Sequence, residues 1–141
     1  MMSYIFAILA AILWGVAPIF DKIVISAGVS LYLANLIRAM GAVFFLSVIV
    51  ICFKHLDLSQ FTAKHFLYLF IAGMMAGGLA MVLYYTALKY EPASRIIPLT
   101  SIYPLFTVTI SAIVLGENLS LKVVLGTILI IIGVALVCSE Q

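Results

Sequence analysis

The sequence predicts an all-α protein, a polytopic membrane helix bundle with about five transmembrane helices. Of its 141 residues, 67% are hydrophobic and 9% are charged, and the mean hydropathy is +1.36. Soluble domains are about 45–50% apolar and about 25% charged, and small ones leave much of their surface in solvent. We therefore expect lipid to cover most of this surface, around a single five-helix domain over residues 1–141.

Five apolar runs are the expected membrane spans. In chain order they cover residues 4–25, 31–53, 66–88, 96–115 and 119–138. At 1.5 Å per residue, a helix over each run is roughly 25–35 Å long, which suits a hydrocarbon core of about 30 Å. Only helices satisfy their own backbone groups in lipid at these lengths, and the alternating strands of a membrane barrel are absent.

Charged residues are rare within these runs. The first is uncharged from Tyr4 to Phe20, the second contains only Arg38, the third and fourth contain none, and the fifth contains only Lys122 near its start. No basic segment precedes the first run, so we expect a retained helix and not a cleaved signal peptide.

The segments between the runs are short, which predicts tight turns between antiparallel neighbours. Turns are expected at residues 28–30, 89–95 and 116–118. Residues 54–65 form a longer connection, and its Leu56, Leu58 and Phe61 predict a segment that lies on the membrane surface.

Basic residues are balanced across the membrane, because five crossings place the two termini on opposite sides. Lys54, Lys64 and Lys122 fall on the side of the N-terminus, and Lys22, Lys89 and Arg95 fall on the other. A protein with one fixed orientation normally carries more Lys and Arg on one side. The balance favours dual topology, in which copies insert both ways. The alternatives are that one or two of these residues lie on the other side, or that helper factors set the orientation.

Several function classes have no support in the sequence. The net charge of +2 and the lack of a basic run argue against nucleic-acid binding. Cys52 and Cys138 show no metal-ligand spacing and are interpreted as packing residues, so no metal or cofactor is expected. The spans contain no paired Asp, Ser–Lys or Ser–His pattern, and His55 and His65 flank the long connection, so we do not expect an enzyme.

The fourth run carries a row of polar residues. Thr100, Pro104, Thr107 and Ser111 recur at i, i+4, i+7 and i+11, which is one face of a continuous helix. Pro104 removes a backbone donor and kinks the helix, as Pro18 does in the first run. The pattern favours a wet midplane cavity, and the alternative is that the hydroxyls only satisfy backbone and assist packing.

The third run carries small residues at helical spacing. Gly73, Gly77 and Ala80, followed by Tyr84, form a stripe that predicts close helix packing. Tyr84 and its neighbour Tyr85 point in different directions.

Arg38 is the clearest intramembrane charge, about 10 Å into the second helix by its position after Leu31. Asp21 lies at a similar depth if the first helix continues past it. An Asp21–Arg38 ion pair is the favoured interpretation, and contact with an anionic substrate or snorkelling to the surface are the alternatives.

Several of these segments together resemble the EamA domain of the drug/metabolite transporter superfamily. They are Leu13-Trp14-Gly15, Leu36-Ile37-Arg38, residues 85–94 (YTALKYEPAS), Tyr103-Pro104-Leu105-Phe106 and residues 115–120 (LGENLS), followed by Gly126 and Gly133. The resemblance covers nearly the whole chain. Arg95 departs from it, since a small or apolar residue is usual there. Helix 1 also lacks the Glu of the small multidrug resistance relatives, so their proton-coupled drug antiport is not supported.

The resemblance implies half of a ten-helix inverted-repeat transporter, which two oppositely inserted copies would rebuild as an antiparallel homodimer. It also implies that Gly126 and Gly133 form the dimer contact. We expect transport of a small metabolite or drug-like solute by alternating access in the cytoplasmic membrane. A subunit that moves lipid-linked head groups and a non-transporting scaffold are the alternatives.

The expected substrate site combines aromatic rings with hydroxyl groups near the middle of the membrane. Rings bind apolar or cationic parts of a solute, and hydroxyls orient its polar groups. The residues expected to line it are Trp14, Tyr84, Thr100, Tyr103, Thr107 and Ser111.

Overall fold

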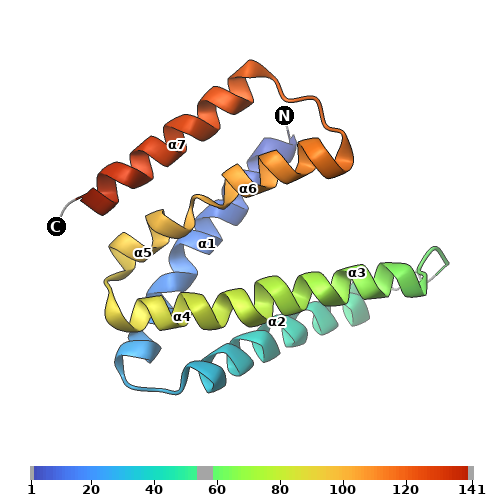
Figure 1. Ribbon diagram of the computed structural model, residues 1–141. Helices are drawn as coiled ribbons and strands as arrows, with labels where there is room; N and C mark the ends of the chain where they lie inside the picture. The colour runs from blue at the N-terminus through green and yellow to red at the C-terminus, as the bar shows by residue number, and fades with distance from the viewer. Residues whose placement is uncertain (1, 54–58, 140–141) are drawn as a thin grey trace. The chain divides into compact units, whose positions relative to one another are not determined.

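The computed structural model describes residues 2–53 and 59–139, and every regular element in these ranges is a helix (Figure 1). In chain order the elements are α1 (Met2–Ser26), α2 (Leu31–Phe53), α3 (Ala63–Gly73), the π-helix η1 (Met74–Leu79), α4 (Ala80–Tyr90), α5 (Ala93–Thr100), α6 (Tyr103–Ile110), the π-helix η2 (Ser111–Leu115) and α7 (Leu121–Ser139).

Within residues 2–53 and 59–139, five helices are long and apolar enough to cross a membrane, which confirms the predicted all-α membrane bundle. The spans are Met2–Ser26, Leu31–Phe53, Ala63–Tyr90, Ala93–Leu115 and Leu121–Ser139. The third consists of α3, η1 and α4 in one continuous helix of 28 residues. The fourth consists of α5, α6 and η2.

Local side-chain chemistry sets the helix ends. The Thr62 side chain accepts a hydrogen bond from the backbone N–H of His65 at 3.3 Å, so α3 begins before the predicted position at Phe66. Gly28 (φ 83°) follows α1 and Gly116 (φ 66°) ends η2, in a left-handed conformation that L residues rarely adopt. The chain also turns between α4, which ends at Tyr90, and α5, which begins at Ala93, so all three predicted turns are present. Lys54, His55, Leu56 and Leu58 lie outside the described residues, so the predicted surface segment stays a prediction.

The fourth span is interrupted, which differs from the continuous helix that the sequence predicts. The helix stops after Thr100 and resumes at Tyr103, with Ser101 and Ile102 between. Pro104 lies in the first turn of α6, where a missing N–H removes no hydrogen bond. Pro98, absent from the predicted kink residues, lies inside α5. Thr100 thus lies on a different helix from Thr107.

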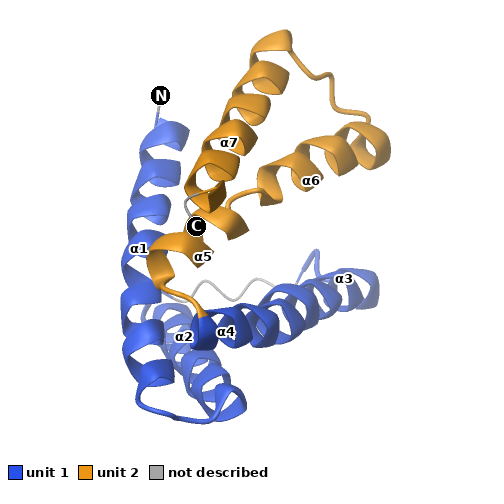
Figure 2. Cartoon of the chain, turned by 60° about the vertical axis from the view of Figure 1, so that its left-hand side comes forward, with its two compact units in different colours: residues 1–90 blue, residues 91–141 orange. Residues whose placement is uncertain are grey.

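The chain divides into two compact units, residues 1–90 and 91–141 (Figure 2). In the first unit, α4 packs against both α1 and α2, which also contact one another. Figure 1 shows α2 lying along the helix that α3 and α4 form. In the second unit, α7 packs against α5 and α6.

Few side chains are buried in the single chain. Tyr85 and Leu88 in α4 are 1% and 0% exposed, and Thr127 and Val134 on one side of α7 are also buried. Most large apolar side chains in the described ranges are exposed. An apolar surface of this extent is typical of proteins that contact a membrane or a partner. The fold thus relies on lipid or on a second subunit to cover its apolar exterior.

Candidate functional site

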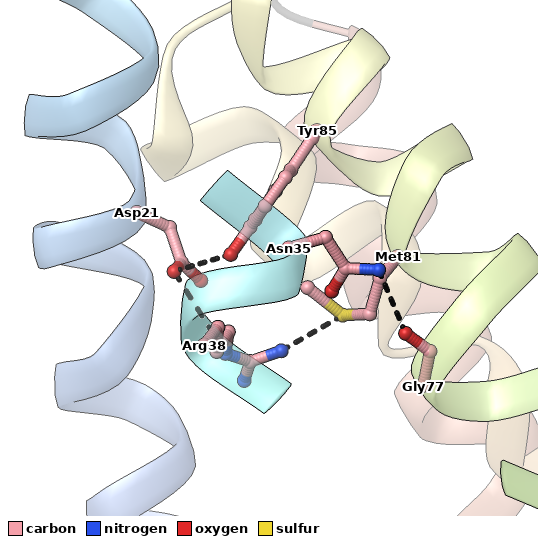
Figure 3. A network of polar contacts seen from close by, with 6 residues as sticks. All are labelled: Asp21, Asn35, Arg38, Gly77, Met81 and Tyr85. Atoms are coloured by element: carbon pink, nitrogen blue, oxygen red, sulfur yellow. Dashed lines mark hydrogen bonds and ion pairs between the residues drawn. The ribbon is translucent and has the colours of Figure 1, made fainter. Parts of the chain in front are cut away.

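The first unit contains a network of polar contacts that joins α1, α2, η1 and α4. Figure 3 shows its six residues, which we call the polar network: Asp21, Asn35, Arg38, Gly77, Met81 and Tyr85. All of them lie in membrane spans, where polar groups are costly unless they meet partners.

Asp21 is the acceptor at the α1 end of the network. The Tyr85 hydroxyl donates to Asp21 Oδ1 at 2.8 Å, and Arg38 Nε lies 3.8 Å from the same oxygen. The ion pair expected from the helix depths is therefore present, although it is longer than a hydrogen bond. The second carboxylate oxygen, Asp21 Oδ2, is buried with no hydrogen-bond partner among the described residues. Asp21 thus retains acceptor capacity that the described residues do not use.

Arg38 and Asn35 bridge α2 to the third span on the other side of the network. Arg38 Nη1 donates to the thioether sulfur of Met81 at 2.9 Å, and Asn35 Nδ2 donates to the carbonyl of Gly77 at 2.9 Å (Figure 3). Gly77 belongs to the π-helix η1. Single π-turns inside α-helices are frequent at functional sites. The predicted small-residue stripe therefore offers a backbone acceptor to α2.

Lys22 extends the contact between α1 and α4. Its Nζ donates to the carbonyl of Leu88, in the last turn of α4, where carbonyls lack intrahelical partners. A cation at this end also complements the helix dipole. Lys22 and Asp21 together fix the C-terminal half of α1 against α4.

Two pockets open beside the polar network, and Arg38 lines both. The first has a volume of about 230 Å³ and is lined by Phe20, Asp21, Val24, Val29, Ala34, Ile37, Arg38 and Tyr85. The second has a volume of about 460 Å³ and is lined by Asn35, Arg38, Ala39, Ala42, Val43, Ala76, Gly77 and Met81. Both are mainly apolar with a few polar groups, as small-molecule sites usually are.

The predicted substrate-site residues are distributed over both units. Trp14 and Tyr84 belong to the first, where Trp14 is 67% exposed and the Tyr84 hydroxyl is buried with no hydrogen-bond partner among the described residues. Thr100, Tyr103 and Thr107, with Ser111, belong to the second. Their assignment to a substrate site stays a prediction.

The hydroxyl groups of the fourth span bond to their own helices. Thr100 donates to the Ile97 carbonyl at 2.8 Å, Thr107 to that of Tyr103 at 3.3 Å, and Ser111 to that of Val108 at 3.2 Å. Hydroxyl bonds to the backbone are what the alternative interpretation predicts, in which these residues satisfy backbone groups and assist packing. Each oxygen still has a free acceptor lone pair, so the contacts are also compatible with a solute.

The glycines expected at helix contacts are open in the single chain. A Cβ atom added at Gly73, Gly77, Gly126 or Gly133 would meet no atom within 4 Å outside its immediate helix neighbourhood. In the described part of the chain α2 contacts η1 without requiring the absence of a side chain at Gly77, so the close packing predicted for Gly73 and Gly77 stays a prediction. The predicted dimer contact at Gly126 and Gly133 stays a prediction.

Arg95 has a local partner. Its Nη1 lies 3.0 Å from Glu91 Oε2, four residues earlier, at the beginning of α5. Half-exposed pairs of this kind contribute little to stability. The departure from the family pattern at this position therefore adds an ion pair at a helix start.

Sequence reasoning missed two members of the polar network, Asn35 and Met81, and it missed the hydrogen bond from Tyr85 to Asp21. One signal was available, because Asp21 and Tyr85 lie the same number of residues before the ends of their spans, at Ser26 and Tyr90. Those two ends face the same side of the membrane in a five-span chain, so the two side chains have equal depth.

Comparison with known proteins places the chain among transporters. A sequence model of the EamA-like transporter family matches residues 1–139. A protein of Methanocaldococcus jannaschii with no assigned function is 32% identical over 134 residues, which cover 95% of this chain and 94% of that protein. An uncharacterized transporter of Archaeoglobus fulgidus is 30% identical over 141 residues, which cover 97% of this chain and 48% of that protein. The chain thus spans about half the length of the Archaeoglobus transporter. No solved structure matches.

Proposed function

Because the chain belongs to the EamA-like transporter family, we propose that it carries a small polar or amphipathic solute across the cytoplasmic membrane by alternating access. The observation that carries this proposal is the polar network in the membrane spans, with the two pockets beside it. A scaffold needs only packed small residues, whereas transport needs polar groups that a solute can reach at membrane depth.

The working unit that we propose is an antiparallel homodimer. The Archaeoglobus transporter is about twice as long as the region it shares with this chain, so two copies of the chain match its length. The Lys/Arg balance permits insertion in both orientations. The open glycines Gly126 and Gly133 on α7 supply a surface where a second helix can approach closely.

The proposed substrate site lies where the two copies meet at the membrane midplane, with each copy contributing the same residues. Trp14 and Tyr103 lie near the middle of their spans and supply aromatic surface. Thr100 and Thr107 supply hydroxyls, and the interruption at Ser101–Ile102 places irregular backbone in the same span. Discontinuous helices of this kind form the substrate sites of many secondary transporters.

A solute screen tests the proposed transport. Purified protein in liposomes, loaded with a mixture of metabolites, should release one chemical class faster than protein-free liposomes do. Equal release from both preparations over the whole mixture would contradict the transporter assignment.

Orientation-locked variants test the proposed dimer. Val29→Lys with Ser30→Lys adds basic charge to one side, and Ser59→Lys with Gln60→Lys adds it to the other. Each locked variant alone should lose most transport, and co-expression of both should restore it. The uncharged pair Ser59→Gln with Gln60→Asn is the control and should transport normally. Full transport by either locked variant alone would exclude the antiparallel arrangement.

A further inference from the structure

The larger pocket beside the polar network combines a floor of small residues with two hydrogen-bond donors. Ala39, Ala42 and Ala76 leave the space of about 460 Å³, and the side chains of Arg38 and Asn35 reach its edge from α2. No acidic residue is among those that line this pocket. Its edge therefore carries one guanidinium and one amide donor, and the Asp21 carboxylate lies outside its lining, with Oδ1 3.8 Å from Arg38 Nε.

Arg38 is poorly matched by its present partners. Its Nη1 bonds to the Met81 sulfur, which is a weak acceptor, and its Nε lies 3.8 Å from Asp21 Oδ1. A guanidinium presents five N–H donors in a planar fork that fits carboxylate or phosphate oxygens in pairs. In a membrane span, where water is scarce, such a group gains strongly from an anionic partner.

Asn35 supports the same interpretation. Its Nδ2 donates to the Gly77 carbonyl at 2.9 Å, and this bond holds the amide at the edge of the pocket, three residues before Arg38 on the same face of α2. An amide NH₂ carries two donors, so an anion can take one while the Gly77 carbonyl keeps the other.

We propose that this pocket binds the carboxylate or phosphate group of an anionic solute, held by Arg38 and Asn35, and that Asp21 competes with the solute for Arg38. The inference rests on the proposed transport function, and it adds to the aromatic and hydroxyl residues proposed above a separate subsite for the anionic group of the solute. In the described state Arg38 lies between the two pockets, with Asp21 on one side and Met81 on the other (Figure 3). When an anion binds, its oxygens replace the Met81 sulfur as acceptors for Arg38 Nη1, and the guanidinium moves away from Asp21.

Binding measurements on the purified full chain in detergent test this proposal without requiring transport. The probes are benzoate and phenyl phosphate, with neutral benzamide as the matched control, and the readout is the shift of the unfolding temperature with probe concentration. Both anions should stabilise the protein in a saturable manner, and benzamide should not. Dodecyl phosphate is added as a separate arm, because lipid head groups offer the same phosphate chemistry.

Three variants test the predicted direction of the change in anion affinity. Arg38→Gln should weaken anion binding about tenfold or more, which is the scale of a lost hydrogen bond to a charged group. Asp21→Asn keeps an acceptor for Tyr85 but removes the competing charge, so it should tighten anion binding several-fold. Arg95→Gln removes an arginine outside the pocket and should leave anion binding unchanged.

The outcomes separate this inference from the proposed function. If Arg38 serves only to pair with Asp21, Arg38→Gln and Asp21→Asn each lower the unfolding temperature, and Asp21→Asn does not tighten anion binding. That result overturns the proposal. Where Arg38→Gln does not purify in a folded form, Arg38→Lys replaces it in the test. Arg38→Lys should weaken anion binding, and Asp21→Asn should tighten it. Stabilisation by dodecyl phosphate alone assigns the pocket to lipid and also overturns it. Transport of cations or neutral solutes without anion binding refutes the anion site only, and anion binding without any transport refutes the transporter assignment only.

Discussion

The hydroxyl of Tyr85 donates to Asp21 Oδ1 at 2.8 Å, from a side chain that is 1% exposed. This bond joins α4 to α1. Apolar packing at this position would accept any large side chain, whereas the hydrogen bond requires a donor on α4 and an acceptor on α1. A hydroxyl that donates to a carboxylate forms a charge-assisted bond, which is stronger than one between neutral groups. The contact therefore specifies how α1 and α4 align, and the neighbouring tyrosine offers a matched comparison.

Tyr85→Phe should lower the free energy of unfolding by about 1.5–3 kcal/mol, because it removes a hydrogen bond to a charged acceptor. Tyr84→Phe is the control, because the Tyr84 hydroxyl is buried with no hydrogen-bond partner among the described residues. Its removal should leave stability unchanged or slightly higher. Thermal unfolding in detergent measures both. Equal losses in the two variants would show that the Tyr85 bond has no special weight.

Removal of either charge of the Asp21–Arg38 pair should destabilise the protein, since each leaves the other charge in a membrane span with a poorer partner. Asp21→Ala and Arg38→Ala should each lower the unfolding temperature, and the double variant should recover part of the loss. A coupling energy of about 0.5–3 kcal/mol in the double-mutant cycle is expected for two groups in contact. Strictly additive losses would argue against the pair.

Dual topology predicts that the same loop can be labelled from both faces of the membrane. In a Cys52→Ala, Cys138→Ala background, a cysteine at Gln60 should react with an impermeant thiol reagent from either side in comparable amounts. A cysteine at Val29, in the preceding connection, should behave likewise. Labelling of Gln60 from one face and Val29 from the other would establish a single orientation.

Thr100→Val and Thr107→Val should each raise the KM for transport by about fivefold, the scale of one lost neutral hydrogen bond. Thr109→Val is the control on the same span. Its hydroxyl donates to the Leu105 carbonyl at 2.8 Å and is not among the residues assigned to the solute. Stability and dimer content should stay constant in all three variants. Normal transport by both Thr100→Val and Thr107→Val would exclude the assigned site.

The membrane spans were predictable because apolar run length and charge placement depend only on the sequence. Their ends were predicted less well where a cap decides them: Thr62 starts α3 before Phe66, and Pro92 precedes the start of α5 at Ala93. A kink at Pro104 was predicted, whereas the structure interrupts the span at Ser101; two prolines, Pro98 and Pro104, share this span, and the predicted kink took only the second into account. A local rule for one proline does not say where a helix with two will break.

Within the candidate site, the Asp21–Arg38 pair was predictable from depth, because each charge had one plausible partner of opposite sign. The contacts of Asn35 and Met81 were not, because they depend on how α2 faces the third span around its long axis. That rotation is altered by η1, and neither a helical period nor a residue preference predicts a π-turn in a run of Met, Ala and Gly.

The π-helical segment Met74–Leu79 sets the angular phase between the two halves of the third span. A π-turn accommodates one residue more than an α-turn, and each residue of an α-helix advances the face by about 100°. Deletion of Gly78 would let the segment close as regular α-helix, and Tyr85 and Met81 would then turn by about that angle relative to α3. The polar network therefore depends on an inserted residue, and a sequence that lacks it at this point keeps the same hydropathy profile while facing α1 and α2 with different side chains.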